Sequence, residues 1–298
     1  MILFLADGNQ IRGDLIASAR LRSDLAPIPM SLELDIRAGE ESIERQLAQD
    51  QILSTAAGDK FRIVKSSKVQ SKDVQGERLM AVMRVTALLD ACHGIAFVRS
   101  RAIIKEQASL AVIYRAGGAT VKAIDADFPV PRFYCPVGET PTFHIARVLQ
   151  EEGGVVRWKD GRLGFVRLPD LFKQGPLTTV AHNAADDVES GFLERHEVPW
   201  FFSLNDTAGF VFGNRDKPRT VLFAPFKNEQ RLRNMTRCLI RRKVVKVPLN
   251  MKAGAGELVE FADGTKLVVM TAAHVWENTG DGGAGQNYTR LWLGELEG

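Results

Sequence analysis

Apolar and polar positions alternate along much of this chain, and short turn sequences separate the alternating runs. Four of these turns pair a glycine with Asp or another Gly: Asp7-Gly8-Asn9, Gly117-Gly118, Asp160-Gly161 and Asp263-Gly264. Glycine supplies the positive φ that tight hairpins need, so each turn predicts a hairpin between two strands. The runs 28–37 and 241–249 add further strands. The pattern therefore predicts a β-rich protein.

Helical spacing is clearest in residues 139–154. Thr140 is a possible cap, Pro141 suits the first helical position, and Gly153 can take the left-handed conformation that ends a helix. The apolar stripe between them consists of Ile145, Val148 and Leu149. A second segment, 39–53, has near-helical spacing but could equally be a polar surface excursion.

Two proline-containing breaks divide the chain. They lie at 125–141 and at 169–177. We therefore expect a first β-barrel-like domain at 1–125, a helix plus β-hairpin connector at 126–172, and a second β-barrel-like domain at 173–298. The expected fold class is mainly β with a small α/β connector (α+β).

The overall composition is that of an ordinary globular protein. Of the 298 residues, 45% are hydrophobic and 25% charged, and the net charge of +3 is too small to indicate a nucleic-acid partner by itself. The three cysteines are far apart, so they imply no disulfide framework, and folding in a reducing cytoplasm is expected. No apolar run approaches a membrane span, and the N-terminus lacks the features of a signal peptide.

The stretch "KLVVMTAAHVWENTGDGGAG", residues 266–285, raises the question of a serine protease. "TAAH" is the setting of the catalytic histidine in trypsin-like enzymes, and "GDGG" is close to the motif around their serine. Gly282 stands where that serine is required, however, and no serine follows Ser203. We therefore predict that the stretch is a strand ending in a glycine-rich turn, and that His274 is not catalytic.

The other histidines offer no recognisable chemistry. Cys92-His93 are sequence neighbours, so in regular structure their side chains point apart. His196-Glu197 lacks the second histidine of a zinc protease. His182 with Asp186 and Asp187 has an unspecific spacing, which favours a solvated acidic loop over a metal site. We predict no catalytic, cofactor-binding or metal-binding residues.

One segment, 231–247, is strongly basic and contains no acid. We call its seven cationic residues the basic strip: Arg231, Arg233, Arg237, Arg241, Arg242, Lys243 and Lys246. Such a strip could bind phosphates, but it lacks the aromatic residues on which bases stack. A solvated or assembly surface is the favoured interpretation, and a nucleic-acid-binding protein is the alternative.

The order of the segments resembles the baseplate hub proteins of contractile phage tails, a family that includes late control D proteins, Mu-type tail hubs and the N-terminal part of VgrG. The helix motif of that family is matched by Phe143, Arg147, Leu149 and Gly153. Its second-barrel motif is matched by Gly256, Val259, Gly264, Val268, Val269, His274, Tyr288 and Thr289. The chain departs from the pattern at Ala255, where proline is usual, and at Glu257, where Asp is usual.

The resemblance implies a non-enzymatic structural protein without cofactors. It implies a homotrimeric ring in the tail baseplate of a virion, assembled in the host cytoplasm, that adapts a six-fold tail tube to a three-fold spike. The implied partners are the tail tube protein, a separate spike protein, and wedge or collar proteins. DNA would be only passing cargo, and no membrane insertion is expected. A hydrolase using His274 or His182 is the remaining alternative.

Overall fold

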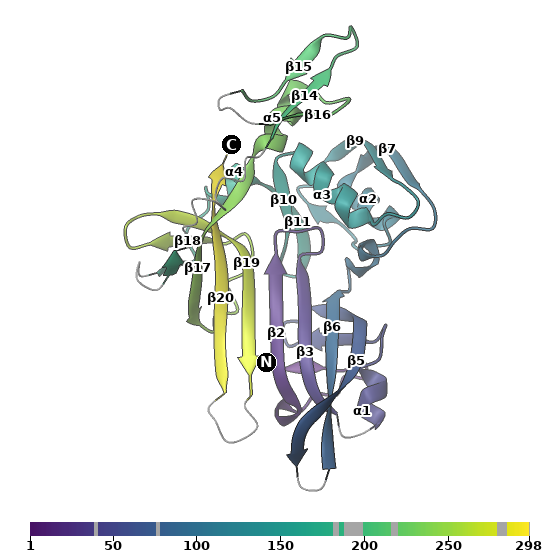
Figure 1. Cartoon of the computed structure of the whole chain (residues 1–298), viewed down its shortest axis with the longest axis vertical. Helices are drawn as coiled ribbons and strands as arrows, with labels where there is room; N and C mark the ends of the chain where they lie inside the picture. Colours follow the sequence, from purple (N-terminus) through teal and green to yellow (C-terminus); the bar gives the residue numbers. More distant parts are fainter. Residues whose placement is uncertain are drawn as a thin grey trace.

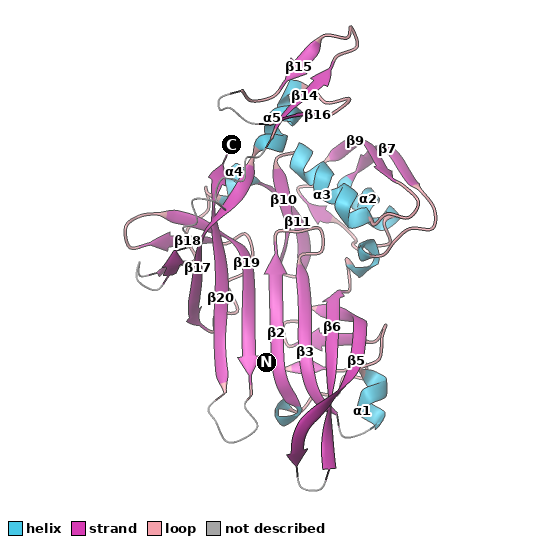
Figure 2. Cartoon of the chain, viewed as in Figure 1, coloured by secondary structure: helices cyan, strands magenta, loops and turns pink. Residues whose placement is uncertain are grey.

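The computed structural model describes residues 1–38, 41–75, 78–180, 185–187, 199–215, 220–278 and 285–297. Strands dominate it, and the helices other than α1 lie toward one end (Figures 1 and 2). The helices are α1 (Glu41–Gln46), α2 (Leu110–Ala116), α3 (Pro141–Glu151), α4 (Leu168–Leu171) and α5 (Glu229–Thr236), with 3-10 turns at Gly13–Leu15 and His93–Ala96. None of them is long and apolar enough to cross a membrane.

The first strand set is an antiparallel sheet in the order β1-β4-β5-β6-β3-β2. Its strands are β1 (Leu3–Phe4), β2 (Ile16–Asp24), β3 (Met30–Ala38), β4 (Ile52–Thr55), β5 (Lys60–Gln75) and β6 (Arg78–Leu89). Alternate residues of β3, Leu32, Leu34 and Ile36, are at most 2% exposed. They belong to the largest core cluster because successive side chains of a strand point to opposite faces.

The second strand set continues the same sheet through β19 (Lys266–Glu277), β20 (Gln286–Glu297), β17 (Cys238–Pro248) and β13 (Ala185–Asp187). The Asp263-Gly264 turn joins β18 (Leu258–Phe261) to β19, as predicted, and Gly264 has φ +84. Short β12 (Thr178–Val180) pairs with β18. A separate small core lies here, centred on residues such as Val259, Phe261 and Leu293.

The two strand sets meet at the pairing of β2 with β19, which lie side by side in Figure 1. The register runs from Thr271 opposite Asp24 to Glu277 opposite Ser18. Across this seam Thr271 Oγ1 donates to Asp24 at 2.6 Å. The expectation of two separate barrels was wrong for this chain: none of the sheets formed by the described residues closes, and one sheet runs through both sets. Backbone pairing between segments about 250 residues apart has no local sequence signal.

Helices α2 and α3 and the β7–β9 pair form the layer above the first strand set (Figure 2). The pair consists of β7 (Ile103–Ser109) and β9 (Pro129–Cys135). The prediction of two strands around Gly117-Gly118 was wrong, because residues 110–116 form α2. Ser109 Oγ accepts a hydrogen bond from the Val112 amide and caps this helix, while Gly118, at φ +95, follows its end. Burial of one helical face overrode the β-branched composition of the segment.

The predicted helix and hairpin of the connector are confirmed. Helix α3 starts at Pro141 and is followed by Gly153 at φ +65. Strands β10 (Gly154–Lys159) and β11 (Arg162–Arg167) then turn at Asp160-Gly161, and β8 (Ile124–Asp125) pairs with β11. The segment 39–53 is helical only in α1 and turns into β4. The predicted domain boundaries stay a prediction.

Candidate functional site

A small three-stranded sheet stands beyond the helical layer at one end of the molecule, together with α5 (Figure 1). Its strands are β14 (Trp200–Leu204), β15 (Phe210–Phe212) and β16 (Val221–Phe223). We call this sheet and α5 the projecting unit. Its sheet pairs with no other sheet in the described chain, so its position depends on side-chain contacts made by α5.

One face of this sheet packs on α5. Phe201 and Val211 lie against a small buried cluster formed by Ala224, Leu232 and Met235. Helix α5 is amphipathic and is capped by Asn228, whose side chain accepts from the Arg231 amide at 3.0 Å. Only three fully buried residues make up the cluster, so it holds the unit together with little apolar burial.

The opposite face is apolar and faces away from α5. Register places Phe202 beside Phe212 on one neighbouring strand and beside Phe223 on the other. Residues on this side of the sheet, which we call the phenylalanine face, are Trp200, Phe202, Leu204, Phe210, Phe212, Val221 and Phe223.

The rings of the phenylalanine face contact one another but stay open to solvent. The centroids of Phe202 and Phe223 are 5.2 Å apart, and those of Phe202 and Phe210 are 5.9 Å apart. Phe210 is 66% exposed and Phe223 52% exposed. The Arg215 guanidinium lies 3.4 Å from the centroid of Phe212. Together they form a contiguous, partly exposed apolar patch, of the kind that is rare on proteins with no interaction site.

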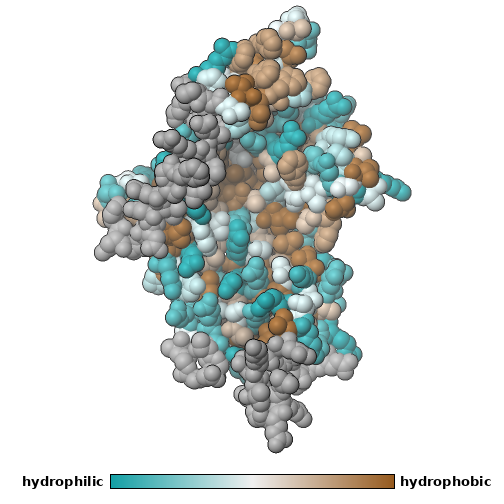
Figure 3. All heavy atoms as spheres, viewed as in Figure 1, coloured by the Kyte–Doolittle hydropathy of each residue, from teal (hydrophilic) through white to brown (hydrophobic). Residues whose placement is uncertain are grey.

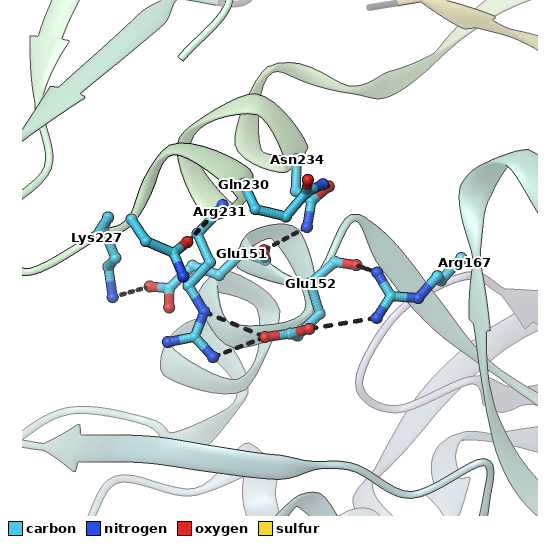
Figure 4. Close-up of polar contacts among 8 residues, drawn as sticks. Glu151, Glu152, Arg167, Lys227, Gln230, Arg231 and Asn234 are labelled. Atoms are coloured by element: carbon cyan, nitrogen blue, oxygen red, sulfur yellow. Dashed lines mark hydrogen bonds and ion pairs between the residues drawn. The ribbon is translucent and has the colours of Figure 1, made fainter. Parts of the chain in front are cut away.

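The projecting unit joins the body at the C-terminal end of α3 (Figure 4). Lys227 Nζ lies 2.6 Å from Glu151 Oε1, and Arg231 Nη2 lies 2.8 Å from Glu152 Oε1. The side chains of Glu152 and Arg231 are 16% and 21% exposed, so this pair is largely shielded from water. We call these contacts the α3–α5 joint.

Two backbone carbonyls at the end of α3 are also satisfied at the joint. Asn234 Nδ2 donates to the Glu151 carbonyl at 3.0 Å, and Arg167 Nη1 donates to the Glu152 carbonyl at 3.0 Å. Carboxylates at a helix C-terminus oppose the helix dipole. The cations of the joint offset this unfavourable arrangement, and the last carbonyls of the helix gain partners.

The structure disperses the basic strip. Arg231 is part of the joint, and Arg233 pairs with Glu229 of its own helix. Arg242 sits at a bulge of β17 and pairs with Glu295 of β20. The Nζ atoms of Lys243 and Lys246 lie 4.9 Å and 3.9 Å from the ring centroids of Phe261 and Tyr288.

Two residues of the basic strip, Arg237 and Arg241, have no ion pair, side-chain hydrogen bond or ring contact within the described ranges. Arg241 is exposed, and Arg237 is half-buried where α5 meets β17. The assignment of the strip to a partner or a channel stays a prediction.

His274 lies in the interior of β19, opposite Thr289 of β20. It is 4% exposed, its Nδ1 is 2.9 Å from Thr289 Oγ1, and burial lowers its pKa to about 4. It is therefore neutral at pH 7 and stabilises a strand pair. Gly282, from the motif compared with a protease serine, lies outside the described residues.

Among the remaining candidate groups, Cys92 and His93 are the ones that the structure describes, and they show no catalytic arrangement. Burial raises the pKa of Cys92 to about 12, so its thiol is protonated, and His93 Nδ1 contacts the Asp90 carbonyl at 2.7 Å. His182 and His196 lie outside the described residues. Within the described ranges, no three His, Cys, Asp or Glu residues gather as metal ligands would.

Sequence reasoning missed the phenylalanine face. The signal was present in "WFFSL", "FVF" and "VLF", three short apolar segments rich in phenylalanine within 200–223. Alternation alone does not reveal it, because residues of both faces are apolar. A search for an excess of aromatic residues on short strands would have found it.

No family model matches the sequence, and no curated protein matches it. Among solved structures, a tail protein from Neisseria meningitidis MC58 matches with a TM-score of 0.66 and 10% identity, over 99% of this chain and 95% of that chain. The 43 kDa tail protein of prophage MuSo2 from Shewanella oneidensis matches with a TM-score of 0.59 and 13% identity, over 98% of this chain and 95% of that chain. The chain has the fold of phage tail proteins.

A third similar structure comes from a secretion machine. It is an E. coli type VI secretion component with structural similarity to the T4 bacteriophage tail proteins gp27 and gp5. It matches with a TM-score of 0.56 and 10% identity, over 93% of this chain and 73% of that chain. At such identities the likeness is one of fold, and the expectation of a phage-tail-like protein is confirmed at that level.

Proposed function

We propose that this protein is a structural hub subunit in the baseplate of a contractile phage tail or a phage-like injection machine. Three copies form a ring that adapts the six-fold tail tube to the three-fold spike. The observation that carries the proposal is the fold likeness to phage tail proteins, which extends over 99% of this chain and 95% of the Neisseria protein. The proposed role is assembly, and it requires no catalysis.

The phenylalanine face supports this role on physical grounds. Five aromatic and two aliphatic side chains lie on one side of a sheet that stands clear of the body. Exposed aromatic residues are costly in a protein that acts alone, whereas aromatic residues are enriched at protein interfaces. In this proposal the face contacts a neighbouring subunit of the ring.

The proposed partners are a tail tube protein, a separate spike protein, and wedge or collar proteins. DNA passes through the ring as cargo. The alternative, a nucleic-acid-binding protein that uses the basic strip, has less support, because Arg231, Arg233 and Arg242 are paired with carboxylates. A gel shift with plain duplex DNA at low salt tests that alternative directly.

The native mass of the purified protein tests the proposal. Light scattering at two concentrations should give about 99 kDa, three times the chain mass of 32.9 kDa. A Phe210→Ser and Phe223→Ser double variant should keep the circular-dichroism spectrum of the wild type, since both rings are exposed, and should lose mass toward one chain. Met251→Ser, at a position that is 52% exposed and lies elsewhere, is the matched control.

Two results would count against the proposal. The first is a wild-type protein that stays a single chain at the higher concentration and also shows no rings in negative-stain images. The second is a phenylalanine double variant that assembles as the wild type does, which would remove the phenylalanine face from the interface.

A further inference from the structure

A pocket of about 520 Å³ opens between the upper end of the β2–β19 seam and the end of α3. Figure 3 shows a recessed apolar area below the projecting unit, at the height of this pocket. Its walls are largely apolar and come from several segments: Leu25, Pro27, Leu149, Val155, Leu239 and Met270. A volume of this size lies in the range of ligand-binding pockets.

The charges on the pocket wall leave one cation unmatched. Arg22 Nη2 donates to Asp24 Oδ1 at 2.8 Å, and Thr271 Oγ1 donates to the same oxygen at 2.6 Å. The charge of Asp24 is thus already balanced by Arg22. Arg237, a half-buried residue, also lines the pocket, and its side chain has no ion pair, hydrogen bond or ring contact in the part of the chain that the structure describes.

A half-buried arginine whose guanidinium has no acceptor loses hydration without a compensating bond. Its planar fork fits a carboxylate, with which it forms a short, charge-assisted pair. The apolar walls beside it select a ligand whose body is apolar. The complementary ligand therefore has an apolar body and a single carboxylate.

We propose that this pocket binds a short peptide segment of a partner protein, with two or three apolar residues followed by a carboxylate that pairs with Arg237. The inference rests on the proposed function in taking the occupant from another protein of the assembly. Because the end of β2, α3, β19 and the start of β17 all contribute to the wall, the bound segment contacts both strand sets and the base of the projecting unit.

The probe is the peptide acetyl-Leu-Val-Leu with a free C-terminal carboxylate, compared with the same peptide amidated, by ligand-observed NMR on the full chain. We expect the acid form to bind at least about tenfold more tightly than the amide, because only the acid forms the charge-assisted pair. Arg237→Gln should remove this preference. Arg241→Gln changes an arginine of the basic strip that does not line the pocket, and this variant should keep the preference for the acid peptide.

A second variant tests the location without touching the charge. Ala146 lines the pocket from an exposed position of α3, so Ala146→Trp should fill the opening and leave the core intact. This variant should weaken the binding of both the acid and the amide peptide. Equal binding of acid and amide, or a preference that survives Arg237→Gln, overturns the assignment of the carboxylate. Absence of binding at millimolar peptide overturns the site.

A third ligand distinguishes the source of the carboxylate. If decanoate binds more tightly than the peptide acid and depends on Arg237 in the same way, the pocket takes free aliphatic acids and the peptide proposal is wrong. Native mass measured on the same samples separates the two proposals. A chain that binds the acid peptide but never forms a trimer contradicts the proposed hub function. A trimer that binds neither peptide contradicts the proposed peptide pocket.

Discussion

Replacing Glu152 with Gln should loosen the projecting unit while leaving the body folded. Glu152 contacts Arg231 at 2.8 and 3.2 Å and Arg167 at 3.5 Å, from a side chain that is 16% exposed. Glutamine keeps the size of the side chain and one oxygen acceptor but removes the charge, so the guanidinium groups of Arg231 and Arg167 lose their counter-charge. Helix α5 has little apolar burial to compensate, so the loss should appear as local opening.

The magnitude follows from the degree of burial. Breaking a fully buried ion pair costs roughly 3–5 kcal/mol and breaking an exposed pair about 0–1 kcal/mol. The α3–α5 joint lies between these limits, so we expect about 2 kcal/mol, which corresponds to an opening equilibrium about 30-fold larger.

Hydrogen exchange followed by mass spectrometry measures this change. Amides of α5 should exchange about 30-fold faster in Glu152→Gln, and amides of β19 should keep the wild-type rate. Glu229→Gln is the matched control, because its pair with Arg233 is 58% and 56% exposed. It should accelerate exchange by less than about fivefold, since an exposed pair contributes at most about 1 kcal/mol.

Two results would refute the reasoning. If Glu152→Gln and Glu229→Gln behave alike, the joint does not hold α5. If a double-mutant cycle between Glu152 and Arg231 gives a coupling energy near zero, the ion pair has no role in the docking of α5, whatever the single variants do.

Three further outcomes are expected. The folded-state pKa of His274, about 4, lies below the ordinary 6.5, so its contribution to stability is complete above pH 6.5 and lost as pH falls toward 4. The loss should reach roughly 3 kcal/mol and be absent in His274→Gln, as judged by urea unfolding across pH; parallel pH profiles would contradict this. Gly264→Ala introduces a side chain at φ +84 in open space and should cost about 1 kcal/mol by urea unfolding. Gly153→Ala, at φ +65, also brings a Cβ to 3.1 Å from Asn234, so it should cost more and speed exchange in α5; equal costs would show that the contact is unimportant.

Local sequence pattern predicted the elements whose signals are local. The connector helix begins at Pro141 and is followed by left-handed Gly153 because proline and glycine have intrinsic backbone preferences. The Asp160-Gly161 and Asp263-Gly264 turns formed hairpins for the same reason. Where burial competed with propensity, as in 110–116, the prediction of a strand was wrong.

The sequence by itself thus determined that the chain is β-rich, that its connector is a helix followed by a hairpin, and that Gly282 stands where the protease motif has its serine. Only the tertiary structure decided that β2 pairs with β19, that acids at the end of α3 meet cations of the α3–α5 joint, and that Arg237 lines an apolar pocket with no side-chain partner among the described residues. The first group follows from backbone preferences of neighbouring residues. The second depends on contacts between residues from about 80 to 250 positions apart, which packing selects and local pattern does not encode.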